Sequence, residues 1–207
     1  MFQAMDRPSQ RDRLAVLLRT HPIVRAYELR QAGVSAAAIS RAVANGELVR
    51  MTRGLYQRAD AELSAHQSLA EASKLVPKGV IALTSALAFH ELTDQMPRKV
   101  WVAISPRDWA PVISYPPIRI TELPDKYMTQ GVEKHQISGI DVPIFSVAKT
   151  LADVFRSRAV DRSIAIEALR AALRNRKATP AEIAQSAQDG GAWRIMRPYL
   201  EALVSDG

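Results

Sequence analysis

Every cationic side chain in the first 58 residues is an arginine: the segment holds ten arginines and no lysine. Against four acidic residues they give it a net charge of +6, out of +7 for the whole chain of 207 residues. The rest of the chain is nearly neutral, with 18 basic and 17 acidic residues. So many planar, permanently charged groups in one short segment are typical of proteins that bind phosphate. We therefore expect this segment to bind nucleic acid.

Apolar spacing predicts three helices in this segment. The first covers residues 11–19, where leucines recur at i, i+3 and i+4. The second covers residues 26–31, and Gly33 follows it where a left-handed residue commonly ends a helix. The third covers residues 36–45, and the Ser35 hydroxyl is placed to accept a hydrogen bond from its first free amides.

The two sides of the third helix differ in composition. At about 100° per residue, one side gathers Ile39, Val43, Ala36 and Ala42, which we expect to face the core. The other side gathers Ala37, Ser40, Arg41 and Ala44. Two helices joined by a short turn, the second with a small-residue outer face, predict a helix-turn-helix whose second helix can approach base edges closely.

A hairpin follows the third helix. Residues 48–52 and 55–57 read as its strands, with Arg53-Gly54 as a two-residue turn. That turn predicts the cross-strand pairs Met51–Tyr56 and Arg50–Gln57. Met51 and Tyr56 are then buried against the helices and Arg50 faces outward. The segment is thus predicted to be a winged helix-turn-helix with Arg53 at the wing tip.

The third helix and the hairpin supply the candidate DNA contacts. Arg41 is expected to read a base edge, because its fork matches guanine. The hairpin arginines are expected at the DNA backbone or in the minor groove, and the helix serines at phosphates. An exposed arginine can also be only a solvated charge, and Arg41 has Glu47 as an alternative partner. The candidates are Ser35, Ala37, Ser40, Arg41, Arg50, Arg53 and Arg58.

The rest of the chain predicts strands followed by helices. Strands are expected at 80–83, 100–104, 118–121, 132–137 and 140–145, the last two joined at Ser138-Gly139. Helices are expected at 61–75, at 85–92 with a Thr84 cap, from Ser146 to residue 156, at 160–176, from Thr179-Pro180, and at 192–204. We predict an α+β fold with a winged helix-turn-helix domain over residues 1–58. Residues 59–207 are predicted to form a mixed α/β domain with a small sheet and a helical C-terminal part.

The sequence argues against a catalytic, cofactor or metal site. The chain has no cysteine, and its four histidines are scattered rather than spaced as ligands. It contains no P-loop, GxSxG, HExxH or GxGxxG motif. His90-Glu91 is the nearest approach to an acid–base pair, but adjacent helical residues point about 100° apart, so we interpret the pair as structural. We expect a protein that is not an enzyme.

Two further expectations concern the surface. The cations Arg170, Arg174, Arg176 and Lys177 are expected to complement the exposed carbonyls at a helix C-terminus, with a second nucleic-acid contact as the alternative. The chain has no apolar run of about 18 residues and no recognisable signal peptide, so we expect a cytoplasmic protein without a membrane partner.

Several of these segments carry a family resemblance. Residues 32–35 (AGVS), 39–43 (ISRAV), 45–50 (NGELVR) and 53–56 (RGLY) resemble the N-terminal domain of AbiEi-type antitoxins. Residues 84–92 (TSALAFHEL) and 142–156 (VPIFSVAKTLADVFR) are similar to blocks in the C-terminal domain of the same family. The resemblance implies a transcriptional repressor that binds inverted repeats upstream of its own gene in a type IV toxin–antitoxin, or phage abortive-infection, operon. It also implies a nucleotidyltransferase-like toxin as functional partner without a tight complex.

Three hypotheses stand at this point. The first is a DNA-binding repressor and antitoxin, acting as a monomer or weak dimer on double-stranded DNA. The second is a DNA-modifying or nuclease-like enzyme with an unrecognised site. The third is a protein-interaction module that acts through residues 59–207, and it is compatible with the first.

Overall fold

The computed structural model describes residues 8–61, 65–111, 113 and 115–205. The helices are α1 (Gln10–Thr20), α2 (Ala26–Gln31), α3 (Ala36–Ala44), α4 (Gln67–Leu75), α5 (Leu83–Phe89), α6 (Asp125–Met128), α7 (Val147–Arg156), α8 (Arg162–Arg174), α9 (Pro180–Asp189) and α10 (Trp193–Ser205). The strands are β1 (Ile23–Arg25), β2 (Leu48–Thr52), β3 (Leu55–Arg58), β4 (Val80–Ile81), β5 (Val100–Ile104), β6 (Ile118–Glu122), β7 (Val132–Ile137) and β8 (Ile140–Phe145). This confirms the predicted α+β fold.

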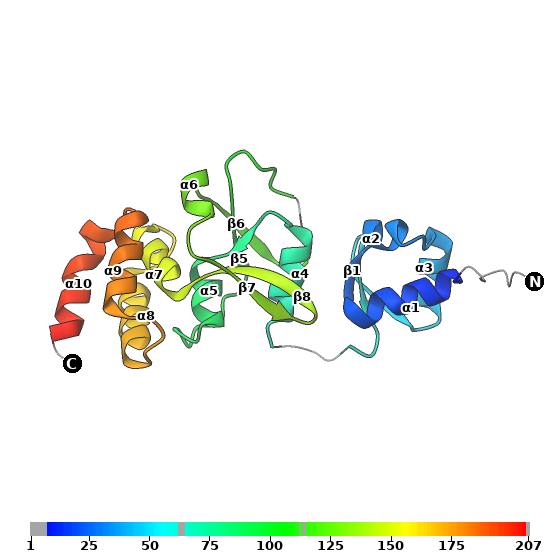
Figure 1. Cartoon of the computed structure of the whole chain (residues 1–207), viewed down its shortest axis with the longest axis horizontal. Helices are drawn as coiled ribbons and strands as arrows, with labels where there is room; N and C mark the ends of the chain where they lie inside the picture. The colour runs from blue at the N-terminus through cyan, green and yellow to red at the C-terminus, as the bar shows by residue number, and fades with distance from the viewer. Residues whose placement is uncertain (1–7, 62–64, 112, 114, 206–207) are drawn as a thin grey trace, which may run out of the picture.

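Elements α1 to β3 form the N-terminal module, drawn in blue and cyan in Figure 1. Its sheet has the antiparallel order β1-β3-β2. Leu14 and Leu18 of α1, Leu29 of α2 and Ile39 of α3 pack together in its core. Three helices over a sheet of this order are the predicted winged helix-turn-helix.

Strand β1 and the inner face of α3 differ from the prediction. No separate strand was predicted for Ile23–Arg25, because three residues form a strand only through pairing, here with β3. On α3, Ile39 and Ala42 are buried as expected. Ala36 is exposed, however, and Ala38 packs against the core in its place.

The register of the β2–β3 hairpin is the main correction in this module. The observed pairs are Val49–Gln57, Arg50–Tyr56 and Thr52–Leu55, with a β-bulge between Arg50 and Thr52. The predicted pairs Met51–Tyr56 and Arg50–Gln57 are therefore wrong, since the bulge inserts one residue into β2. Tyr56 packs against the helices, whereas Met51 packs against residues of the C-terminal half.

The second sheet has five strands in the order β6-β5-β4-β8-β7. Strand β4 runs parallel to β8 and antiparallel to β5, β5 runs parallel to β6, and β7–β8 is an antiparallel hairpin. The central strand β5 is buried on both faces: Trp101 and Ala103 join one apolar cluster, and Val100, Val102 and Ile104 join the other. This alternation is the period of two expected for a strand covered on both sides.

Different helices cover the two faces of this sheet. Helix α4 packs on one face, through residues such as Leu69 and Val76. Helix α7 packs on the other, backed by α8 to α10, which lie at the end of the molecule opposite the N-terminal module (Figure 1). The predicted caps Ser146 of α7 and Thr179 of α9 are confirmed, because each hydroxyl accepts from the amide three residues on.

Some predicted boundaries in the C-terminal half are wrong. Helix α5 begins at Leu83 rather than at residue 85, so Thr84 lies inside it and does not cap it. Helix α4 begins at Gln67 rather than at residue 61. Helix α6 follows Pro124 in a segment for which no helix was predicted. The helix expected at 160–176 is shorter, because α8 covers Arg162–Arg174.

The N-terminal module and the C-terminal half share one apolar cluster. Ile23 of β1 and Leu55 of β3 are fully buried in the same cluster as α4 and strands β4, β5 and β8. The Gln67 Nε2 atom donates to Gln57 Oε1 of β3 (3.0 Å), and Lys74 forms an ion pair with Glu28 (2.7 Å). The predicted domain boundary at residue 58 coincides with the end of β3, and the division into two domains stays a prediction.

The helices offer no candidate for crossing a lipid bilayer. None within the described ranges is both long enough and apolar enough to do so.

Candidate nucleic-acid interface

Helix α3 is held in place by its cap and by its inner face. Ser35 has extended backbone geometry, and its hydroxyl accepts a hydrogen bond from the Ala38 amide (3.3 Å). Ile39 and Ala42 then anchor the helix in the core of the module. Because this face is fixed, the opposite face is fixed toward solvent.

That outer face carries Ala37, Ser40, Arg41 and Ala44, all exposed as predicted. Three of the four side chains are small, so the helix backbone can approach a partner closely. Arg41 lies beside a hollow of about 400 Å³ between α3 and the start of α1. Glu47, its predicted alternative partner, instead forms an ion pair with Arg11 (2.8 Å). Within the described residues, Arg41 has neither an ion pair nor a side-chain hydrogen bond.

Ser35 differs from the other candidates on α3, because its polar groups are already used. Besides capping the helix, its hydroxyl donates to Gln10 Oε1 of α1 (2.8 Å), and its amide donates to the same oxygen (3.0 Å). Ser35 therefore ties α3 to α1, and its hydroxyl proton is engaged inside the protein.

Two hairpin arginines are free to meet a ligand. Arg50 pairs across the sheet with Tyr56, which packs against the helices, so both side chains lie on the α3 side of the sheet. Arg53 occupies the turn with Gly54, whose φ of +76° suits a glycine. Both arginines are exposed, and neither forms an ion pair with another described residue.

Arg58 has a structural role instead. It lies at the base of the hairpin, paired across the sheet with Leu48, at the end far from Arg53. Its Nε donates to Asp60 (2.5 Å), and its Nη1 lies 3.5 Å from the Leu18 carbonyl oxygen. These contacts join the end of β3 to α1, so this guanidinium is less available than those of Arg41 or Arg53.

Sequence reasoning missed two residues beside the wing. Arg25 ends β1 and pairs with Leu55, next to the Arg53-Gly54 turn. Its guanidinium lies 5.4 Å from the centre of the exposed Tyr27 ring at the start of α2. The β-branched pair Ile23-Val24 after a proline was the available signal for the strand that positions Arg25. Its cross-strand partner Leu55 is buried against the C-terminal half, so Arg25 lies on that face of the sheet, opposite Arg50. The interface thus combines cations on α3 and the hairpin, an arrangement suited to polyanion binding.

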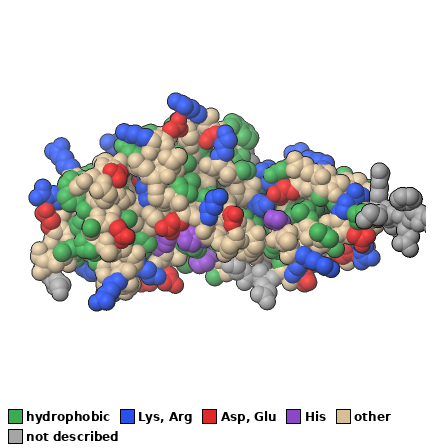
Figure 2. Space-filling model, in the orientation of Figure 1, with side chains coloured by type: hydrophobic (Ala, Val, Ile, Leu, Met, Phe, Trp, Pro, Cys, Tyr) green, Lys and Arg blue, Asp and Glu red, His purple; other side chains and the backbone are tan. Residues whose placement is uncertain are grey.

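A cluster of histidines lies in the C-terminal half. Sequence reasoning treated the histidines as scattered, but His66, His90 and His135 surround Phe89 at ring-centroid distances of 5.0, 5.2 and 4.7 Å. Figure 2 shows histidines gathered near the middle of the molecule. No group of three or more His, Asp or Glu side chains among the described residues has the arrangement of a metal site.

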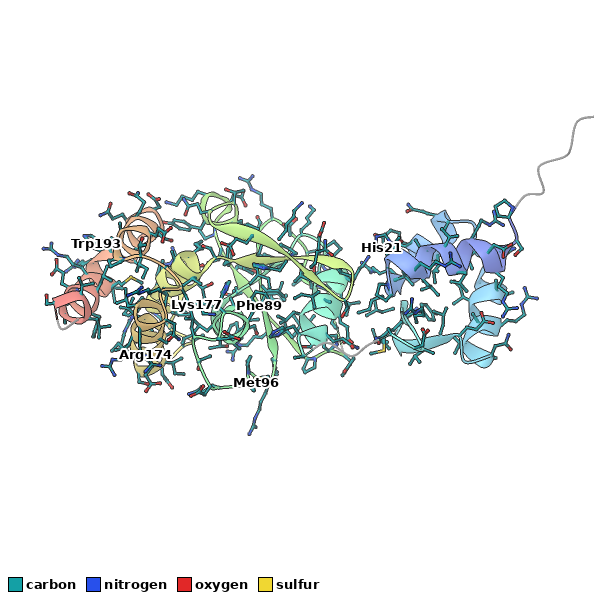
Figure 3. All side chains as sticks on the ribbon, turned by 60° about the horizontal axis from the view of Figure 1, so that its bottom comes forward. His21, Phe89, Met96, Arg174, Lys177 and Trp193 are labelled. Carbon is teal, nitrogen blue, oxygen red and sulfur yellow. The ribbon has the colours of Figure 1, made fainter. Side chains whose placement is uncertain are left out.

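His90 and Glu91 each have a separate partner within the protein. His90 Nε2 lies 2.7 Å from the Phe145 carbonyl oxygen, and Glu91 forms an ion pair with Lys177 (2.8 Å). Burial lowers the pKa of His90, which outweighs the opposite effects of the Phe145 hydrogen bond and of Glu133. Figure 3 labels Phe89 and Lys177 in this region, which belongs to the C-terminal half.

Comparison with known proteins bears on the N-terminal module. None of the curated proteins matches the chain. Among solved structures it is similar to the RV2827C protein from Mycobacterium tuberculosis, with 15% sequence identity, a TM-score of 0.56, and coverage of 97% of this chain and 82% of that one. At this identity the likeness concerns the fold alone. The C-terminal blocks that resemble AbiEi proteins stay a prediction. Residues 12–59 match the family described as transcriptional regulator, AbiEi antitoxin, which confirms the resemblance for the N-terminal module.

Proposed function

We propose that this protein is a sequence-specific DNA-binding repressor that regulates its own operon as the antitoxin of a type IV toxin–antitoxin system. The observation that supports it most directly is the match of residues 12–59 to AbiEi transcriptional regulators. The exposed arginines without acidic partners on α3 and the wing add physical support. Because the proposed ligand is chromosomal DNA, we place the protein in the cytoplasm.

The proposed contacts divide by role. Arg41, flanked by Ala37 and Ala44, reads a base edge in the major groove, since a small-residue face permits close approach. Arg50 and Arg53 contact the DNA backbone or minor groove beside it, and Ser40 donates to a phosphate. Two copies of the protein, as monomers or a weak dimer, occupy the two halves of an inverted repeat.

The test is fluorescence anisotropy on a labelled duplex from the region upstream of the gene, with a scrambled duplex as control, over a series of salt concentrations. We expect the upstream duplex to bind at least about 10³-fold more tightly, with a steep negative salt dependence. Equal and weak binding to both duplexes would contradict the proposal.

Three arginine variants sharpen this test. Arg41→Ala is expected to weaken specific binding by about 5- to 150-fold and to relax discrimination at one base pair. Arg53→Ala is expected to weaken both duplexes alike and to reduce the salt slope by about one. Arg194→Ala removes the same charge from the exposed surface of α10, far from α3 and the wing, and serves as the control, with an expected change of less than about twofold. Equal losses in all three variants would point to net charge rather than to a defined interface.

The antitoxin role has a separate test. We propose that a nucleotidyltransferase-like toxin encoded beside this gene is neutralised without a tight complex. Co-expression of the full chain is expected to restore growth of cells that make the toxin, while the two proteins elute separately in size-exclusion chromatography. Arg41→Ala is expected to keep this rescue while losing repression, because it changes only the DNA-facing surface. Failure of the unmodified chain to restore growth would exclude the antitoxin role.

A further inference from the structure

A groove of about 410 Å³ opens where the N-terminal module meets the C-terminal half. Most of its lining is apolar: Leu75, Val76 and Pro77 come from the end of α4, Ile104 ends β5, and Trp109 and Pro111 come from the loop that follows. Its volume lies within the range of small-molecule sites, which occur preferentially at such junctions.

Trp109 is the unusual member of this lining. Its side chain is 79% exposed, whereas Trp101, eight residues earlier, is buried under the stacked guanidinium of Arg119. An exposed tryptophan at the rim of an apolar groove commonly marks a binding surface, because the ring offers a large contact area at small entropic cost.

The charge of the groove is positive. Arg25 of β1 contributes to the lining, and its guanidinium donates to the Lys74 carbonyl oxygen (3.2 Å). No acidic side chain among the described residues forms an ion pair with it. The other cation of the lining, Lys78, is neutralised by Asp108 (2.7 Å). The guanidinium of Arg25 therefore stays available for an anionic group on a ligand.

The same arginine connects the groove to the wing. Arg25 pairs with Leu55 across the sheet, and the amide of the next residue, Ala26, donates to the Gly54 carbonyl oxygen (2.8 Å). Gly54 and Arg53 form the wing turn. A molecule that contacts Arg25 in the groove thus acts on the backbone that holds the wing tip.

We propose that this groove binds a small organic anion with an aromatic body, and that its occupancy changes the affinity of the protein for DNA. The apolar lining and Trp109 would contact the body, and Arg25 the carboxylate or sulfonate. The binding half of this proposal is independent of the proposed function, whereas the regulatory half rests on it.

The binding half is tested with 1-anilinonaphthalene-8-sulfonate, an aromatic sulfonate whose fluorescence rises on binding. Titration of the full chain is expected to give a Kd on the order of tens of micromolar. Trp109→Ala and Arg25→Gln are expected to weaken binding by about tenfold or more, and Arg25→Lys, which keeps the charge, by less. Met96→Ala is the matched control: Met96 is 81% exposed, but it lies in the loop before β5, at the opposite end of that strand from the groove (Figure 3).

Thermal unfolding of each variant separates loss of the groove from loss of the fold. If Arg25→Gln unfolds, Trp109→Ala decides the question, since removal of an exposed ring leaves the core intact. Dye binding that is absent, or equal in the wild type and Trp109→Ala, would overturn the proposal.

The regulatory half is tested by adding saturating dye to the anisotropy assay, with a red fluorophore on the duplex. We expect the Kd for DNA to change by about fivefold or more in the wild type and to stay constant in Trp109→Ala. Unchanged DNA affinity with the groove occupied would overturn regulation through the wing. If the chain binds neither duplex even without dye, the proposed function is contradicted, and the regulatory half of this proposal with it. The dye titration still tests the binding half.

Discussion

The ion pair between Lys149 and Asp153 gives the sharpest prediction about stability. The two side chains lie one turn apart on α7 and are only 1% and 3% exposed. Lys149 Nζ lies 2.6 and 2.8 Å from the two carboxylate oxygens of Asp153. Arg156 Nη2, 3.6 Å from the same carboxylate, is the only other cation that forms an ion pair with Asp153 within the described chain.

Removal of one partner leaves the other charge in a low-dielectric environment. Asp153→Ala strands the ammonium of Lys149 in the core, and we expect it to lower the free energy of unfolding by about 3–5 kcal/mol. For a chain of this size the same change lowers Tm by about 6–20 °C. Replacing both residues, with Lys149→Met and Asp153→Leu, is expected to be close to neutral, because no charge stays buried.

Urea unfolding measures Asp153→Ala against the wild type, and the wild type, Lys149→Met, Asp153→Leu and the double variant form a double-mutant cycle. The single variants are expected to be much less stable than the double variant. If Asp153→Ala costs less than about 1 kcal/mol, water reaches Lys149 in the absence of its partner, and the reasoning from burial is refuted.

Three further variants test other parts of the structure. Glu71→Gln is expected to stabilise the protein at pH 7, because burial raises the pKa of Glu71 above 4.5 and its Oε2 has no hydrogen-bond partner in the described residues; in urea unfolding the gain should fade as the pH falls toward 4.5, because the buried carboxyl of the folded wild type is protonated before that of the unfolded chain. The pKa of His90 is lowered below 6.5, so the unfolded chain binds the proton first and stability is lost as the pH falls below that value; His90→Gln, which can still donate to the Phe145 carbonyl, should flatten this dependence. Gly139→Ala is expected to cost about 1–2 kcal/mol in the same assay, because Gly139 has a φ of +69° and the added Cβ would lie 2.8 Å from Pro22 Cδ. An unchanged stability in any of the three would contradict the corresponding contact.

Local signals in the sequence predicted local structure well. The start of α3 follows from the Ser35 cap, and the end of α2 from Gly33, whose φ is +77°. The β7–β8 hairpin follows from Ser138-Gly139, both of which have positive φ. Caps and turns are predictable because they involve residues within a few positions of one another.

Features that depend on distant partners were not predictable in the same way. Strand β1 exists only through pairing with β3, and the bulge at Met51 is accommodated by the C-terminal half, against which Met51 packs. The histidine cluster around Phe89 brings together α4, α5 and β7. In the candidate interface, helix periodicity identified Arg41, but the engagement of Arg58 with Asp60 and Leu18 required the folded chain.

The predicted boundary at residue 58 marks the end of the winged-helix segment in the sequence, but the packing of apolar side chains continues across it. Tyr56 faces the helices of the N-terminal module, while Leu55 and Ile23 are fully buried on the other face against the C-terminal half. A winged helix excised at residue 58 would expose both of these side chains to water, at a cost of about 1.5–3 kcal/mol each. Stability of the module is of the same order as this loss, since small domains are only marginally stable. The C-terminal half therefore acts as part of the scaffold that holds the wing, which is the physical reason for proposing that a ligand bound at the junction changes the affinity for DNA.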